Sequence, residues 1–198
     1  MRNIYIRLLE DQPENTKINI HIPIRGDMLD YCIEANREVL KVSNFDGIDF
    51  KPDSFQIPHI TLYMGFVRNE ADFKEIMNNV YLFSKEIEPF EILPSKAFLK
   101  GPKRNYIFIG TKQSQKIIDL KKEIKNILNK YIEPLSFDVV NEIPHITIGY
   151  IKKDFYLVEE TLEKLEVGPS FWANAIEVSF CGSFGSCIGT IRTFEFGK

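Results

Sequence analysis

Two short segments of the chain carry the same residues, and both contain a group that can transfer protons. Residues 57–61 read Ile-Pro-His-Ile-Thr, and residues 143–147 repeat these five letters 86 positions later. The chain contains three histidines, and two of them lie in these segments. An imidazole, with an unperturbed pKa of about 6.5, takes up or releases a proton near neutral pH. The repeat therefore predicts a site in which two histidines act together.

The spacing of the polar residues within each segment indicates how they would be presented. Side chains alternate between the two faces of a strand, so residues two apart share a face. His59 and Thr61 would thus lie together, as would His145 and Thr147, with isoleucines on the opposite face. If helices cover the isoleucine faces, the two His/Thr faces are left to meet across a cleft.

Two imidazoles facing each other across a cleft suit phosphoryl chemistry. One histidine can take a proton from the attacking hydroxyl while the other donates a proton to the leaving oxygen. Threonine hydroxyls beside them can donate to the non-bridging oxygens of a phosphate as charge builds there. This chemistry requires no metal and no cofactor, and the sequence offers no convincing carboxylate cluster for one. The sequence does not decide which histidine is the acid and which the base.

Hydrophobic periodicity predicts the elements that would position these groups. Apolar residues at helical spacing predict four helices, at 27–42, 69–86, 114–132 and 154–167. Short, apolar-rich runs predict strands at 3–9, 18–24, 57–67, 90–100, 105–110, 143–151, 175–182 and 189–196.

These elements repeat in the same order. Adding 86 to the strand at 18–24 and to the helix at 27–42 gives elements of the same kind, as expected for an internal duplication. We expect one bilobal α+β domain over 1–198, with structural repeats at about 1–86 and 87–198. Pseudo-twofold symmetry would then set two antiparallel sheets around a central cleft, with helices on the outer faces.

The composition limits the possible ligands and the cellular location. The chain is 44% hydrophobic, and its 25 basic and 28 acidic residues give a net charge of −3. That balance argues against binding a long nucleic-acid duplex and leaves room for a small anionic ligand. Three cysteines and the lack of a long apolar run favour a cytoplasmic protein with free thiols and no membrane span. We also expect a monomer.

The paired motifs resemble those of the 2H phosphoesterase superfamily, which includes the 2′-5′ RNA ligase-like and cyclic phosphodiesterase families. The resemblance covers both motifs, their spacing and the order of strands and helices. It implies metal-independent cleavage of 2′,3′-cyclic phosphates, 2′-5′ linkages or related cyclic nucleotides, with a nucleotide or short RNA as the partner. It also implies that His59 and His145 are the acid/base pair and that Thr61 and Thr147 bind the phosphate. Tyr150 stands where bacterial RNA ligase-type members carry an arginine.

Four further residues are candidates for substrate binding. Tyr63 and Tyr150 lie near the ends of the motif strands, where aromatic rings can stack on a base, and Tyr63 shares the parity of His59. Arg104, in a basic turn, and Arg192, in the last strand, are candidate phosphate ligands. Ordinary packing or a solvated hairpin is the competing explanation for each.

The third histidine, His21, could look into the same cleft, because isoleucines flank it. The residue 86 positions later is Ile107, so the duplication favours a structural or merely exposed histidine. The basic run at 121–130 is interpreted as a solvated helix face.

Three alternatives remain for the function. The enzyme would open 2′,3′-cyclic phosphates in RNA processing, or it would cleave a signalling nucleotide such as a 2′-5′ oligoadenylate or a cyclic dinucleotide. A protein of the same fold could instead bind nucleotides or RNA without turnover. Metal binding by the three histidines is the least favoured.

Overall fold

The computed structural model describes residues 16–43, 56–101, 103, 105–112, 115–135, 143–182 and 185–197. The strand expected at 3–9 and the candidate Arg104 lie outside these residues. The described elements are β1 (Thr16–Pro23), α2 (Asp27–Leu40), β2 (His59–Val67), α3 (Glu70–Glu86), β3 (Phe90–Lys100), β4 (Tyr106–Lys112), α4 (Gln115–Leu128), β5 (Ile132–Pro134), β6 (His145–Tyr150), α5 (Phe155–Lys164), β7 (Phe171–Ala173), β8 (Ala175–Cys181) and β9 (Cys187–Glu195).

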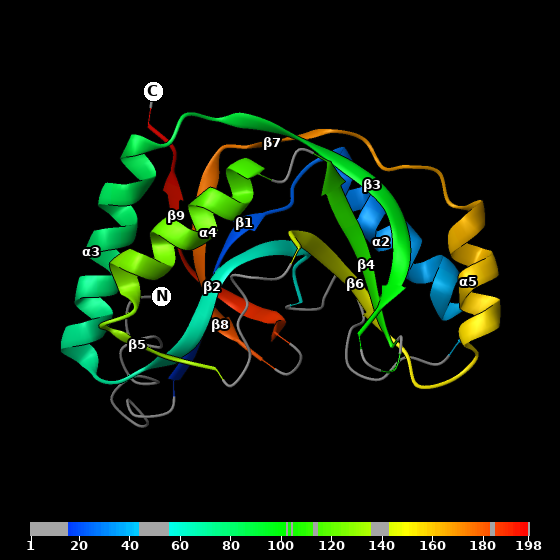
Figure 1. Ribbon diagram of the computed structural model, residues 1–198, viewed down its shortest axis with the longest axis horizontal. Coiled ribbons are helices and arrows are strands. Elements are labelled where there is room, and N and C mark those ends of the chain that lie inside the picture. The colour runs from blue at the N-terminus through cyan, green and yellow to red at the C-terminus, as the bar shows by residue number, and fades with distance from the viewer. Residues whose placement is uncertain are drawn as a thin grey trace.

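Two antiparallel sheets form the frame of the molecule (Figure 1). The first has the order β5-β2-β1-β8-β9 and the second β6-β4-β3-β7. The motif strands β2 and β6 pack against each other, and Figure 1 shows both beginning near the centre of the molecule. The expected α+β architecture with two antiparallel sheets is confirmed; the short strands β5 and β7 were not predicted.

The lobes do not coincide with the two halves of the sequence. Helix α2 follows β1 in the chain but packs on β6 and α5 of the second sheet, whereas α4 packs on β2 and α3 of the first. Strands β8 and β9, from the end of the chain, complete the first sheet. The boundary expected between the two repeats, near residue 86, is therefore not a boundary between the lobes. The element order is duplicated, but each lobe takes elements from both halves.

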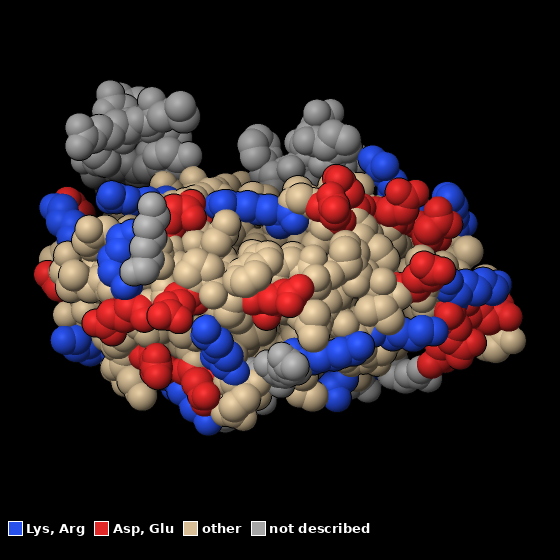
Figure 2. Space-filling model, turned by 90° about the horizontal axis from the view of Figure 1, so that it is seen from above, with Lys and Arg blue, Asp and Glu red and all other residues tan. Residues whose placement is uncertain are grey.

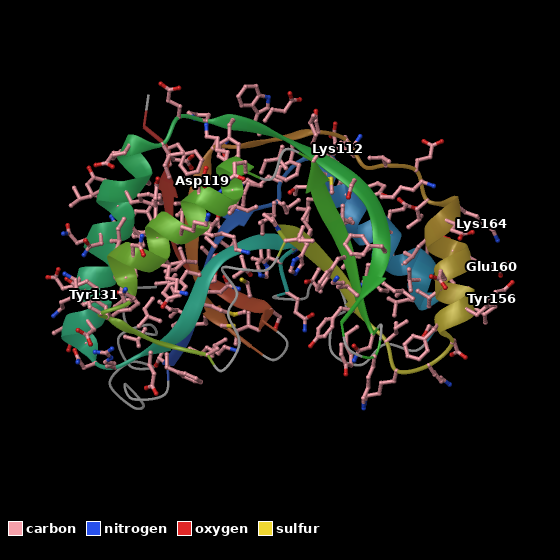
Figure 3. All side chains as sticks on the ribbon, in the orientation of Figure 1. Lys112, Asp119, Tyr131, Tyr156, Glu160 and Lys164 are labelled. Atoms are coloured by element: carbon pink, nitrogen blue, oxygen red, sulfur yellow. The ribbon has the colours of Figure 1, made fainter. Side chains whose placement is uncertain are left out.

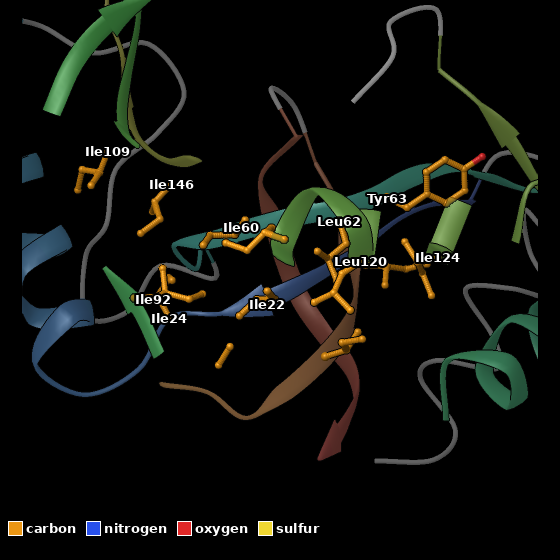
Figure 4. Packing of buried hydrophobic residues seen from close by; sticks show 14 of the residues in the cluster. Ile22, Ile24, Ile60, Leu62, Tyr63, Ile92, Ile109, Leu120, Ile124 and Ile146 are labelled. Carbon is orange, nitrogen blue, oxygen red and sulfur yellow. The ribbon is translucent and has the colours of Figure 1, made fainter. Parts of the chain in front are cut away.

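The isoleucine faces of the strands form the core, as expected. Ile20 and Ile60 in the first sheet, and Ile109 and Ile146 in the second, belong to one cluster of buried apolar side chains. Figure 4 shows this packing, with Leu120 of α4 among the labelled residues. Burial of each such side chain contributes on the order of 1.5–3 kcal/mol to stability. The opposite faces of β2 and β6 are left for polar residues.

Each motif strand carries a β-bulge at the same position. In the first sheet, Thr61 pairs with His21 but Tyr63 pairs with Ile20, so Leu62 is the extra residue. In the second, Thr147 pairs with Phe108 and Gly149 with Ile107, so the extra residue is Ile148. A bulge inserts one residue into one strand and thereby reverses the alternation beyond it.

Charged side chains of both signs cover the surface (Figure 2). In the face shown in Figure 2, Lys and Arg alternate with Asp and Glu, and no broad basic patch is visible. Among the described residues, none of the helices is both long and apolar enough to span a bilayer.

Candidate active site

The two motif histidines are held by equivalent hydrogen bonds. Nδ1 of His59 donates to the carbonyl oxygen of Ile57 at 2.7 Å, and Nδ1 of His145 donates to that of Ile143, also at 2.7 Å. A carbonyl can only accept, so Nδ1 carries a hydrogen in both rings. Nε2 is therefore the nitrogen of each ring that can exchange a proton. The carbonyl two residues earlier is in place because Pro58 and Pro144 extend the backbone at the strand starts.

In the first lobe, a buried amide connects the motif residues. Nδ2 of Asn19 donates to Nε2 of His59, to Oγ1 of Thr61 and to the carbonyl oxygen of Gly185, each at 3.1 Å, so three acceptors share its two hydrogens. The Gly185 carbonyl fixes which end of the amide faces this cluster, because an amide oxygen could not bond to it. Asn19 was not predicted, although it and His21 are the polar residues that alternate with isoleucine in β1.

In the second lobe, aromatic rings and not a polar side chain lie beside the motif histidine. The Phe108 ring stacks on the His145 ring, with centroids 3.6 Å apart and an interplanar angle of 18°. Tyr106 continues the row, 5.8 Å from Phe108 and 5.0 Å from Tyr150. The half-exposed Tyr106 and Tyr150 rings leave a surface on which a base can stack. Neither Tyr106 nor Phe108 was predicted; their alternation with Ile107 and Ile109 was the available signal.

Burial sets the charge state of both histidines. It lowers the pKa of His59 to about 3, with the charges of His21 and His145 acting in the same direction. It lowers the pKa of His145 to about 4, aided by the charge of Lys121. The Nδ1 hydrogen bonds act in the opposite direction, because they favour the charged ring. Since a phosphate would bring negative charge to the cleft, bound substrate should raise both pKa values.

A charged group lies behind His59. Glu177 accepts hydrogen bonds from Arg25 (2.8 Å), Thr193 (3.0 Å) and Thr190 (3.2 Å). Its Oε2 is 3.5 Å from Nε2 of the fully buried His21. Burial by itself would raise the pKa of Glu177, but its contacts with His21 and Arg25 outweigh it and lower that pKa to about 2. His21 therefore does not line the cleft.

The structure places two of the candidate substrate-binding residues, Tyr63 and Arg192, away from the motif histidines. Tyr63 was placed on the His59 face by parity, but the bulge at Leu62 turns it to the helix side, where it is 4% exposed and lies beside α4 (Figure 4). Met64, and not Tyr63, lies opposite Asn19 on the neighbouring strand. Arg192 pairs with Val178, whose side chain lies in the core beneath the helices, and it lines a surface groove between α3 and β9.

The bulge at Ile148 has the opposite effect on Tyr150. Simple alternation from His145 would turn Tyr150 toward the helices, but it pairs with Tyr106 and joins the cleft side. Lys121 is a further surprise, because a helix face interpreted as solvated contains a lysine that is only 1% exposed. Within the described residues, no three His, Cys, Asp or Glu side chains are grouped so as to hold a metal ion.

Together, the fold and site define a class of protein: a two-sheet α+β domain with one His-x-Thr strand in each sheet. The family model of the 2′-5′ RNA ligase superfamily matches residues 40–179. The chain belongs to this superfamily, the group of the 2H phosphoesterases. No curated protein sequence matches the chain.

Solved structures share the fold at low sequence identity. Apo LigT of Escherichia coli is 12% identical with a TM-score of 0.63, covering 93% of this chain and 99% of LigT. TT0787 of Thermus thermophilus is 13% identical with a TM-score of 0.64, covering 92% and 99%. Usb1 of Kluyveromyces marxianus, solved with uridine monophosphate, is 14% identical with a TM-score of 0.54, covering 92% and 99%. At these identities the similarity establishes the fold.

Proposed function

We propose that this protein is a metal-independent phosphodiesterase that acts on 2′,3′-cyclic phosphate RNA ends or on 2′-5′-linked or cyclic (oligo)nucleotides. One observation carries the proposal: both motif histidines are anchored through Nδ1 by the same 2.7 Å hydrogen bond, each with a threonine two residues later. Superfamily membership indicates a phosphoesterase, and the ligand in Usb1 is a nucleotide.

The reaction needs two proton transfers in opposite directions. For a cyclic phosphate, one imidazole takes a proton from water through Nε2 as the water oxygen bonds to phosphorus. The phosphorus–oxygen bond to one ribose oxygen breaks, and the other imidazole donates its Nε2 proton to that oxygen. Thr61 and Thr147 donate to the non-bridging oxygens. The histidines end with exchanged protonation states, which solvent restores.

The aromatic row of the second lobe provides a place for the base. Tyr106 and Tyr150 are half exposed beside the ring of His145. Stacking on such rings contributes about 1–3 kcal/mol per base. A nucleotide bound there would place its phosphate between the two lobes.

The test is a substrate panel assayed in EDTA, with 2′,3′-cyclic mononucleotides, 2′-5′ and 3′-5′ oligoadenylates and cyclic dinucleotides. We expect turnover of one class, absent in the His59→Ala, His145→Ala double variant, and a bell-shaped pH dependence of kcat/KM. Binding of these nucleotides without turnover would contradict the proposal and favour a non-catalytic binding protein.

A further inference from the structure

The two lobes differ at the position that faces each motif threonine across the sheet. His21 is the cross-strand partner of Thr61, whereas Phe108 is the cross-strand partner of Thr147. Because of the bulges, the structural counterpart of His21 is thus Phe108 and not Ile107. A group that can carry charge stands behind one motif histidine, and an apolar ring stands against the other. This asymmetry bears on which histidine begins the reaction with a proton.

The ring of His21 lies against an ionised carboxylate and a backbone carbonyl. Nδ1 lies 3.4 Å from the carbonyl oxygen of Asn19, and Nε2 lies 3.5 Å from the Glu177 carboxylate. The carbonyl and the carboxylate are acceptors, the carboxylate is held ionised by Arg25 and two threonines, and the Cys187 thiol lies 3.5 Å from Nδ1. The contact with Glu177 is long for a hydrogen bond but is within ion-pair range.

The surroundings of His59 suit a neutral ring. Nδ1 faces an acceptor, the Ile57 carbonyl, while Nε2 faces a donor, the Asn19 amide. A second proton on Nε2 would meet the Asn19 hydrogens and the charge of a protonated His21, whose ring centroid is 4.8 Å away. Cys187, whose Sγ is 3.6 Å from Nε2, stays a neutral thiol because burial raises its pKa. The carbonyls of Ile57 and Gly185 favour protonation of His59, but burial and the charge of His21 outweigh them.

The surroundings of His145 favour the charged form more than those of His59. Nδ1 donates to Ile143, and the ring lies flat on Phe108. An aromatic face attracts a cation stacked on it. Lys121 opposes this, because its charge disfavours a second cation nearby. A bound phosphate would favour the imidazolium.

We propose that His21, paired with Glu177, is a positioning residue that keeps His59 unprotonated, so that His59 is the general base and His145 the general acid. This assignment rests on the proposed phosphodiesterase function. His21 acts through the His59 ring, since it is fully buried and cannot touch substrate.

The first test is the pH profile of kcat/KM for His21→Gln, which keeps a polar side chain but cannot carry charge. The acidic limb, which reports protonation of the base, should move toward neutral pH by roughly half to one unit, while the basic limb stays. Ser84→Ala is the matched control, because Ser84 is also a buried polar residue but lies on α3. An unmoved acidic limb, or a shift confined to the basic limb, would overturn the assignment.

The second test needs no turnover and uses the unmodified protein, so it separates this inference from the proposed function. Nitrogen NMR of 15N-histidine-labelled protein at pH 6, assigned with single His→Gln variants, reports the protonation of each ring. With inorganic phosphate as the probe, His59 should stay neutral with its proton on Nδ1 while His145 gains a second proton. If His59 gains the proton first, the assignment is wrong whatever the substrate.

Discussion

Asn36 of α2 donates a 2.6 Å hydrogen bond through Nδ2 to the carbonyl oxygen of Ile148, the extra residue of the bulge in β6. This contact joins a helix from the first half of the chain to the motif strand of the second. The bulge in turn places Tyr150 on the cleft side. Through this bond, the position of α2 supports the geometry of the site.

Asn36→Ala should therefore destabilise the protein by about 1–3 kcal/mol, because it leaves the buried carbonyl of Ile148 without this donor. Urea unfolding gives the value. Asn79, whose side chain bonds to the Glu75 carbonyl on the exposed side of α3, is the control. Asn79→Ala should change the free energy of unfolding by no more than about 0.5 kcal/mol. Equal effects of the two substitutions would show that the bond to Ile148 contributes no more to stability than an exposed hydrogen bond.

Replacement of either motif histidine should remove most of the activity. We expect His59→Ala and His145→Ala each to lower kcat by roughly 10²- to 10⁴-fold, the range for loss of one general acid or base. The double variant should be little worse than either single variant, since both groups act in one step. Steady-state kinetics measures the loss of activity. Far-UV circular dichroism spectra that match the unmodified protein show that the variants are folded. Near-normal kcat in either single variant would exclude a paired mechanism.

The threonines should matter less than the histidines. Thr61→Val and Thr147→Val keep the side-chain shape but remove the hydroxyl, and each should lower kcat by up to about 10²-fold. Thr61 also accepts from Asn19, so its loss should disturb His59 as well. Thr161, whose hydroxyl bonds to the Leu157 carbonyl on α5, provides the control substitution Thr161→Val. Full activity in the Thr61→Val, Thr147→Val double variant would rule out a phosphate-binding role.

The aromatic row of the second lobe and the surface groove between α3 and β9 give opposite predictions for substrate affinity. Tyr150→Ala should raise KM by roughly 5- to 150-fold, because it removes about 1–3 kcal/mol of stacking. Arg192→Met should leave KM unchanged, since Arg192 lies over Phe194 in the groove beside α3. Tyr156, which is 72% exposed and points away from the sheets on α5 (Figure 3), is the tyrosine control. A raised KM in Arg192→Met would place the substrate outside the cleft.

Stability should fall steadily as the solution is acidified. His59 and His145 have folded-state pKa values of about 3 and 4, below the unfolded value of 6.5, so below pH 6.5 the unfolded chain binds protons that the folded protein does not. Glu177, with a folded pKa of about 2 against 4.5, adds to the loss between pH 4.5 and 2. Thermal melts from pH 8 to 3 should show a Tm that falls below pH 6.5. A flat Tm would contradict the buried, neutral state of the histidines.

Much of this arrangement follows from the sequence. The two pentapeptides, their 86-residue separation and the isoleucines between the polar positions predicted the two motif strands and the cores behind them. Those patterns are local, because alternation along a strand depends only on the residues of that strand. The placement of His59 with Thr61, and of His145 with Thr147, needed nothing more.

The tertiary structure decided what local patterns could not. A bulge arises from the pairing of one strand with its neighbour, so the strand's own alternation gave no sign that Tyr63 would turn inward and Tyr150 toward the cleft. The crossing of α2 and α4 between the lobes, and with it the burial of Lys121, depends on which distant sheet each helix meets. Which sheet a helix packs on depends on how well the two surfaces fit. The apolar stripe of a helix predicts only that one face of the helix is buried.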